Sequence, residues 1–175
     1  MNNMVISVKD KLSDETYQKM KNLNEIKFKY GDVIYFAKDN IDKGQEGYRY
    51  NGLTGELISD WPDDNFVIIG IDGSIGDGGE PIILKVDESN LPIYHFENLD
   101  WNYPAIIADS LDDYIKINNI IAEYSKEIEE SNLNEQDFNH LIEEIKKIND
   151  NSYWINFLIT ATPSDEPWVE SWTLQ

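Results

Sequence analysis

The sequence contains no cysteine and a single arginine, and its basic residues are scarce. Without cysteine the chain forms no disulfide, offers no thiolate to a metal ion and has no cysteine nucleophile. The N-terminus lacks a basic stretch followed by an apolar run, and no apolar segment approaches the roughly 18 residues that a membrane helix needs. From these features we expect a cytoplasmic protein that does not bind a membrane.

Acidic residues dominate the charge balance. Lysine and arginine together number 14 against 34 aspartates and glutamates, which gives a net charge of −20 at pH 7. Such a chain repels nucleic-acid phosphates and anionic lipid headgroups, so we expect neither as a partner. A basic protein is attracted instead, and the field accelerates its association. Acidic surfaces also keep proteins soluble, so the charge alone leaves both interpretations open.

The length and the apolar content favour one folded domain over residues 1–175, because 41% of the residues are hydrophobic and 12% are aromatic. Cap signals and apolar spacing predict helices at 13–22, 110–130 and 134–148. Short apolar runs predict strands at 32–37, 66–71, 81–86, 93–97 and 153–161, a hairpin over 48–58 and an irregular connection at 99–105. Because the links between the strands from 66 to 97 are short, we expect an α+β fold with a largely antiparallel sheet packed with helices.

The sequence offers no recognisable catalytic motif. The two histidines, His95 and His140, lie in a predicted strand and beside the apolar stripe of a predicted helix, and neither has an orienting partner in a motif. Nucleophile-elbow, phosphate-loop, zinc-protease and dinucleotide-binding patterns are all missing. We therefore expect no enzyme, although a hydrolase with two catalytic carboxylates stays open because 34 acidic residues allow almost any pair.

The glycine-rich segment 72–80 resembles a calcium-binding loop only superficially. Calcium loops place oxygen ligands at the first, third, fifth and twelfth positions. Counted from Asp72, the fifth position is Gly76 and the twelfth is Ile83. We therefore expect no metal and no cofactor, and we attribute the glycines to a tight connection between strands.

Aromatic residues among acids in predicted loops indicate a surface that binds another protein. Interface cores favour Trp and Tyr, and carboxylates pair with the Lys and Arg side chains of a partner. Alternatively, the same aromatic side chains close the ends of the hydrophobic core. The residues that we expect to contact a partner are Trp61, Asp63, Asp64, Asp72, Asp77, Trp101 and Tyr103.

The middle of the chain resembles the SUKH superfamily, the family of Smi/Knr-type domains. An apolar strand ends at Gly70, a Gly/Asp-rich loop follows, and the next apolar strand ends near Asp87. The segments 92–94 (Pro-Ile-Tyr) and 108–114 (Ala-Asp-Ser-Leu-Asp-Asp-Tyr) follow in the family's order. The resemblance covers about 66–120. The N-terminal third diverges, because 14–30 lacks the family's Leu-Pro start and closing Asn-Gly-Gly, and the helix and tail over 131–175 are additional.

This resemblance implies a sheet packed with helices, no conserved catalytic set and a role in protein–protein binding. Many bacterial members resemble immunity proteins that neutralise toxins, often nucleases. Because a toxin that binds nucleic acid tends to be basic, this expectation agrees with the acidic charge. We therefore expect an immunity protein. A general interaction or scaffold protein in cell-envelope or stress regulation is the alternative, and the oligomeric state stays open.

Overall fold

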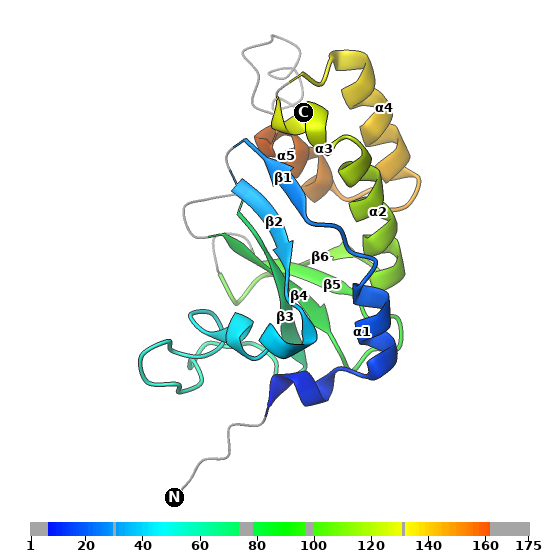
Figure 1. Cartoon of the computed structure of the whole chain (residues 1–175). Coiled ribbons are helices and arrows are strands. Elements are labelled where there is room, and N and C mark those ends of the chain that lie inside the picture. The colour runs from blue at the N-terminus through cyan, green and yellow to red at the C-terminus, as the bar shows by residue number, and fades with distance from the viewer. Residues whose placement is uncertain (1–6, 30, 74–78, 97–99, 131, 162–175) are drawn as a thin grey trace, which may run out of the picture.

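A six-stranded antiparallel sheet forms the centre of the computed structural model, which describes residues 7–29, 31–73, 79–96, 100–130 and 132–161 (Figure 1). Each strand pairs with the next one along the chain, so the sheet is a meander. The prediction of an α+β fold with an antiparallel sheet is confirmed. The strands are β1 (Ile26–Phe28), β2 (Gly31–Tyr35), β3 (Phe66–Asp72), β4 (Glu80–Lys85), β5 (Ile93–Phe96) and β6 (Pro104–Ala108).

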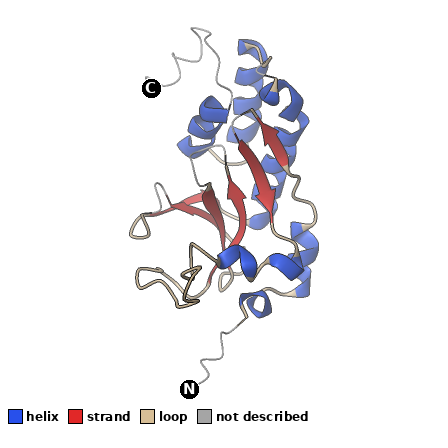
Figure 2. Cartoon of the chain, turned by 60° about the vertical axis from the view of Figure 1, so that its left-hand side comes forward, coloured by secondary structure: helices blue, strands red, loops and turns tan. Residues whose placement is uncertain are grey.

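Five α-helices accompany the sheet in the described part of the chain, and the longer ones gather on one of its faces (Figure 2). They are α1 (Asp14–Met20), α2 (Leu111–Glu123), α3 (Ser125–Glu129), α4 (Glu135–Lys146) and α5 (Ser152–Ala161). The 3-10 turns are η1 (Val8–Lys11), η2 (Lys38–Asn40) and η3 (Lys43–Gln45). No helix among the described residues is long and apolar enough to cross a membrane.

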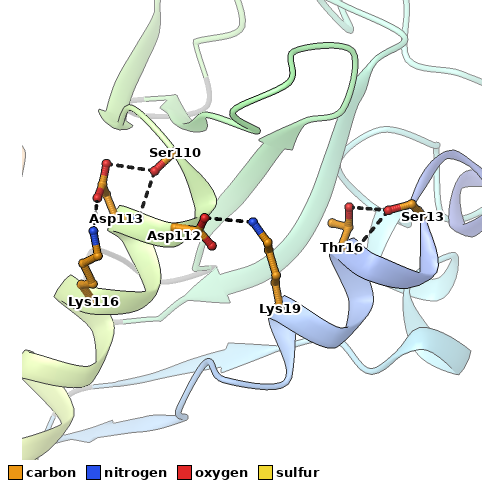
Figure 3. A network of polar contacts seen from close by, with 7 residues as sticks. All are labelled: Ser13, Thr16, Lys19, Ser110, Asp112, Asp113 and Lys116. Carbon is orange, nitrogen blue, oxygen red and sulfur yellow. Dashed lines mark hydrogen bonds and ion pairs between the residues drawn. The ribbon is translucent and has the colours of Figure 1, made fainter.

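The predicted helix starts are confirmed by side-chain caps. The Ser13 hydroxyl accepts a hydrogen bond from Thr16 N, and the Ser110 hydroxyl accepts one from Asp113 N, both at 3.0 Å. Lys19 then joins the two helices through an ion pair of 2.9 Å with Asp112 (Figure 3). The caps thus fix where each helix starts, and the ion pair links α1 to the start of α2.

The central strands β3 and β4 are buried on both faces, which explains their apolar runs without alternation. On β3, Val67 and Ile69 belong to the large core under the helices. Phe66 and Ile68 face the other way, into a smaller core with Ile83 and Phe96. A strand covered on both sides needs apolar residues at every position. The long connection between β2 and β3, residues 36–65, supplies part of the cover for the smaller core through Trp61.

The prediction of a strand over 153–161 is wrong, because this segment forms the helix α5. Its buried residues are Trp154, Phe157, Leu158 and Ala161, whose spacing matches one helical face. Asn151 Oδ1 also accepts a hydrogen bond from Tyr153 N at 2.9 Å at the start of the helix. Aromatic and β-branched residues raised the strand propensity, but packing on the sheet decided the outcome.

Three further elements differ from the sequence-based expectation. Strand β1 and strand β6 were not predicted, and β6 begins within the expected irregular connection at 99–105 and extends beyond it. The expected helix over 110–130 is interrupted at Tyr124, which separates α2 from α3. The hairpin over 48–58 is reduced to a single antiparallel bridge between Tyr50 and Leu57, and Gly55 takes the positive φ of 70°.

Candidate functional site

The β2–β3 connection (residues 36–65) is attached to β3 by a buried glutamine. Strand β2 pairs with β3 only over Gly70–Asp72, so the backbone of the first half of β3 needs other partners on that side. The Gln45 side chain is fully buried and hydrogen-bonds both backbone groups of Ile68, donating to its O at 2.8 Å and accepting from its N at 3.1 Å. It thereby acts as a short substitute for a neighbouring strand.

The only arginine of the chain, Arg49, provides the second attachment. Arg49 is 3% exposed, and its guanidinium donates to Phe66 O at 2.8 Å and to Asp64 O at 3.1 Å. A further bond of 3.0 Å reaches the Asp64 carboxylate. The cation also lies over the Trp61 ring, 5.4 Å from its centre. These contacts hold the end of the connection rigidly against β3.

Four of the residues predicted to contact a partner come together here. Trp61 and Trp101 pack with their ring centres 5.1 Å apart, and the Trp61 indole donates to Asp63 O at 2.7 Å. Asp63 also lies 3.7 Å from the Lys85 ammonium. Asp64 completes the group through its ion pair with Arg49.

Exposure separates the predicted residues into two groups. Trp61 is only 9% exposed and belongs to the smaller core, which agrees with the alternative interpretation that this aromatic ring closes the core. The Asp64 side chain is 74% exposed and Tyr103 is 75% exposed, so both are accessible to a partner. The turn at 100–103 and the β2–β3 connection therefore form neighbouring parts of one surface.

Asp72 does not belong to that surface, so the prediction that it meets a partner from an exposed loop is wrong. It is 1% exposed, and its carboxylate accepts a hydrogen bond of 3.3 Å from the Tyr153 hydroxyl of α5. The physical reason is that β3 extends to Asp72, where the chain is still covered by helices. Asp77, from the same predicted loop, lies outside the described residues.

Asp72 is part of a buried polar group that the sequence did not reveal. Glu80 is its cross-strand partner on β4, and the Glu80 carboxylate hydrogen-bonds His95 Nε2 on β5. The Tyr153 ring covers the His95 ring at 4.8 Å between centres. Four residues from β3, β4, β5 and α5 therefore form one buried acid–histidine–tyrosine group. Because 153–161 was expected to be a strand, no sequence signal joined Tyr153 to these three strands.

Two more tyrosines extend this group toward α2. The hydroxyls of Tyr35 and Tyr114 lie 3.0 Å apart, and the Asn118 amide donates to Tyr35 at 2.9 Å. Burial raises the pKa of Tyr35, Tyr114 and Tyr153, and the nearby Asp72 charge raises each of them further. The cavity between these side chains measures about 10 Å³, the space of one water molecule, so the group as arranged has no room for an organic substrate.

The other histidine, His140, lies on the exposed side of α4, 3.6 Å from Glu144 one helical turn away. Among the residues that the structure describes, no three His, Cys, Asp or Glu side chains are arranged to hold a metal ion. The accessible surface of the described residues carries mainly carboxylates, together with lysines, amides and a few aromatic and apolar side chains.

Five of the thirteen lysines form close ion pairs with neighbouring acids. Ion pairs join Lys19 to Asp112, Lys27 to Asp32, Lys38 to Asp14, Lys85 to Glu88 and Lys116 to Asp113, all within 3.1 Å. The carboxylates outside these ion pairs outnumber the remaining basic side chains. Within residues 46–64, five carboxylates accompany one cation, and that cation is the buried Arg49.

Comparison with known proteins adds no relative. No family model matches this chain, and no match is found among curated proteins or among solved structures.

Proposed function

We propose that this protein is a binding module for a basic protein, and that it acts as a cytoplasmic immunity protein that neutralises a toxin by direct contact. The observation that carries the proposal is the excess of exposed carboxylates over residues 46–64 of the β2–β3 connection, where the only cation is the buried Arg49. The resemblance of 66–120 to Smi/Knr-type domains supports the immunity role. The proposal concerns a protein partner, because this charge repels nucleic acid and anionic lipid.

The binding surface combines the β2–β3 connection with the turn at 100–103. Asp64 and Tyr103 are exposed on it, and the packing of Trp61 on Trp101 joins the two segments. Both segments are attached firmly, so little conformational entropy is lost when a partner binds. A toxin that acts on nucleic acid presents Lys and Arg in its cleft, and carboxylates that engage these side chains block access of the phosphates.

A binding experiment with the toxin domains encoded beside the gene tests this proposal. We expect one domain to bind with nanomolar affinity, and we expect the association rate to fall as salt is added, because screening weakens charge steering. Co-expression should protect cells from that toxin. If no neighbouring toxin domain binds and no cell is protected, the proposed function is wrong.

A further inference from the structure

A groove of about 530 Å³ lies between the 3-10 turn η1 and the β2–β3 connection. Its size is in the range of pockets that bind small groups. Ser7 and Val8 form one side of it, and the connection forms the rest. The lining residues contributed by the connection are Asp39, Asp42, Lys43, Glu46, Tyr50 and Gly55.

The groove is lined by three acidic side chains, and only one of them makes hydrogen bonds within the described protein. Asp42 holds the two sides together, accepting hydrogen bonds from the Ser7 hydroxyl at 2.6 Å and from Lys9 N at 2.9 Å. The carboxylates of Asp39 and Glu46 are exposed and make no hydrogen bond or ion pair with any described residue. Lys43 is the single cation in the lining. The groove therefore attracts a further positive charge.

An aromatic ring in the same lining adds affinity for cations. Tyr50 lies in the groove, and its ring already attracts the Arg49 guanidinium, whose central carbon is 5.5 Å from the ring centre. A ring that faces a cation stabilises it through its quadrupole. Carboxylates beside a tyrosine suit the long aliphatic stem and charged end of lysine or arginine.

Beside the groove, the turn at 51–56 carries a fully exposed leucine. Leu53 is 98% exposed and Leu57 is 51% exposed. The turn is held in shape because Asn51 Oδ1 accepts hydrogen bonds from Leu53 N at 2.9 Å and from Thr54 N at 3.1 Å. Leu53 is thus presented in a fixed position next to an acidic groove, which Gly55 of the same turn helps to line.

We propose that the groove receives a lysine or arginine side chain of the basic partner and that Leu53 enters an apolar depression beside that side chain. This inference rests on the proposed function and names the part of the surface that recognises the partner. Charge complementarity identifies the occupant. An apolar contact at the edge of the charge pair excludes water and strengthens it.

The first experiment needs no toxin. Isotope-labelled protein is titrated with hexalysine, and the backbone amide signals are followed by NMR. We expect the largest shifts at Asp39, Lys43, Glu46 and Tyr50, and we expect them to disappear in the variant Asp39→Lys/Glu46→Lys. Shifts spread evenly over all exposed acidic residues, including those of α4, would overturn the assignment of the groove.

The second experiment measures the affinity of the protein for the toxin domain that binds it in the experiment proposed above. The salt concentration is about 150 mM, at which charges are screened beyond about 8 Å. We expect Asp39→Lys/Glu46→Lys and Leu53→Ala each to weaken binding at least about tenfold. The control is Glu129→Lys/Glu143→Lys, which makes the same change in net charge on α3 and α4. These helices lie at the opposite end of the molecule from the β2–β3 connection, which lines most of the groove (Figures 1 and 2). The control variant should bind within about twofold of the unchanged protein.

The outcomes separate the two proposals. If the toxin binds and the groove variants bind it equally well, the groove assignment fails and the proposed function stands. If no toxin binds, the proposed function fails, and the hexalysine titration decides about the groove. If the protein forms a dimer that the groove variants dissociate, the groove belongs to a second copy of this chain and the inference is overturned.

Discussion

At the scale of single residues, two buried polar side chains replace a missing strand. Gln45 satisfies both backbone groups of Ile68, and Arg49 satisfies the carbonyl of Phe66. An unpaired backbone group at such buried positions costs free energy comparable to a lost hydrogen bond. These two side chains therefore fix the β2–β3 connection, and with it the surface that we propose binds the partner.

We expect Arg49→Lys to lower the free energy of unfolding by about 2 kcal/mol, because an ammonium cannot reproduce the planar fork that bonds Phe66 O and Asp64 O. Urea unfolding measures the loss. Asp64→Asn is the matched control and should cost less than about 1 kcal/mol, because its carboxylate is largely exposed. Equal losses in the two variants would show that the exposed ion pair, and not the buried bonds, holds the connection.

The buried tyrosines predict a loss of stability in alkali. Burial raises the pKa of Tyr153, Tyr114 and Tyr35 above their usual value of 10.0. The unfolded chain therefore releases these protons at lower pH than the folded one. The contribution of the protonated tyrosines to the free energy of unfolding is complete below about pH 10 and is lost as the pH rises further. The slope is about 1.4 kcal/mol per pH unit for each such tyrosine.

Above about pH 10 the free energy of unfolding falls with pH, and Tyr153→Phe should reduce the slope of this fall by the share of one tyrosine, about 1.4 kcal/mol per pH unit. Denaturant unfolding at a series of pH values measures it. Tyr103→Phe, at a position that is 75% exposed, is the control and should leave the slope unchanged. An identical slope in the Tyr153 variant and the unchanged protein would contradict the role given to its burial.

At the scale of secondary-structure elements, helix α5 completes the core. Trp154, Phe157 and Leu158 are buried on its inner face, and Phe157 packs edge to face on Phe28 of β1 at 5.4 Å. The Trp154 indole donates to Ile107 O of β6 at 2.8 Å. The helix thus contacts both outer strands of the sheet, through ring packing on β1 and through a hydrogen bond to a backbone carbonyl of β6.

We expect Trp154→Ala to destabilise the fold by about 3–5 kcal/mol, because it removes a large buried ring and leaves Ile107 O without its donor. Trp154→Phe keeps much of the packing and should cost clearly less. Urea unfolding of both variants measures the difference. Near-neutral results for the alanine variant would mean that α5 is not required for the core.

At the scale of the whole molecule, the charge of −20 opposes folding. Repulsion among uncompensated carboxylates destabilises the compact state, whereas exposed lysine–carboxylate pairs each contribute little. Salt screens both effects, and the repulsion is the larger because the acids outnumber the cations. The same excess of carboxylates thus lowers stability and attracts the proposed basic partner.

The melting temperature should therefore rise when sodium chloride is increased from about 20 mM to about 300 mM. Thermal unfolding followed by circular dichroism measures the shift. The variant Glu129→Lys/Glu143→Lys carries two reversals of two charge units each, which reduces the net charge from −20 to −16. It should show a smaller rise with salt. A melting temperature that falls with salt would show that attractive ion pairs dominate instead.

The sequence by itself determined the features that arise locally or from composition. The caps at Ser13, Ser110 and Asn134 follow from neighbouring residues. The strands between 66 and 96 follow from continuous apolar runs, which are typical of strands covered on both faces. The net charge and its implications for partners are also fixed by composition. These signals need no knowledge of distant contacts.

The tertiary structure alone decided which faces are covered. Asp72 became buried and α5 became a helix because distant segments pack on them, and short apolar segments are compatible with either a helical or an extended conformation. The joining of Asp72, Glu80, His95 and Tyr153 likewise depends on sheet register and on the docking of α5. Burial is a property of the whole packed chain, so residue identity alone could not assign these side chains to the interior or Leu53 to the surface.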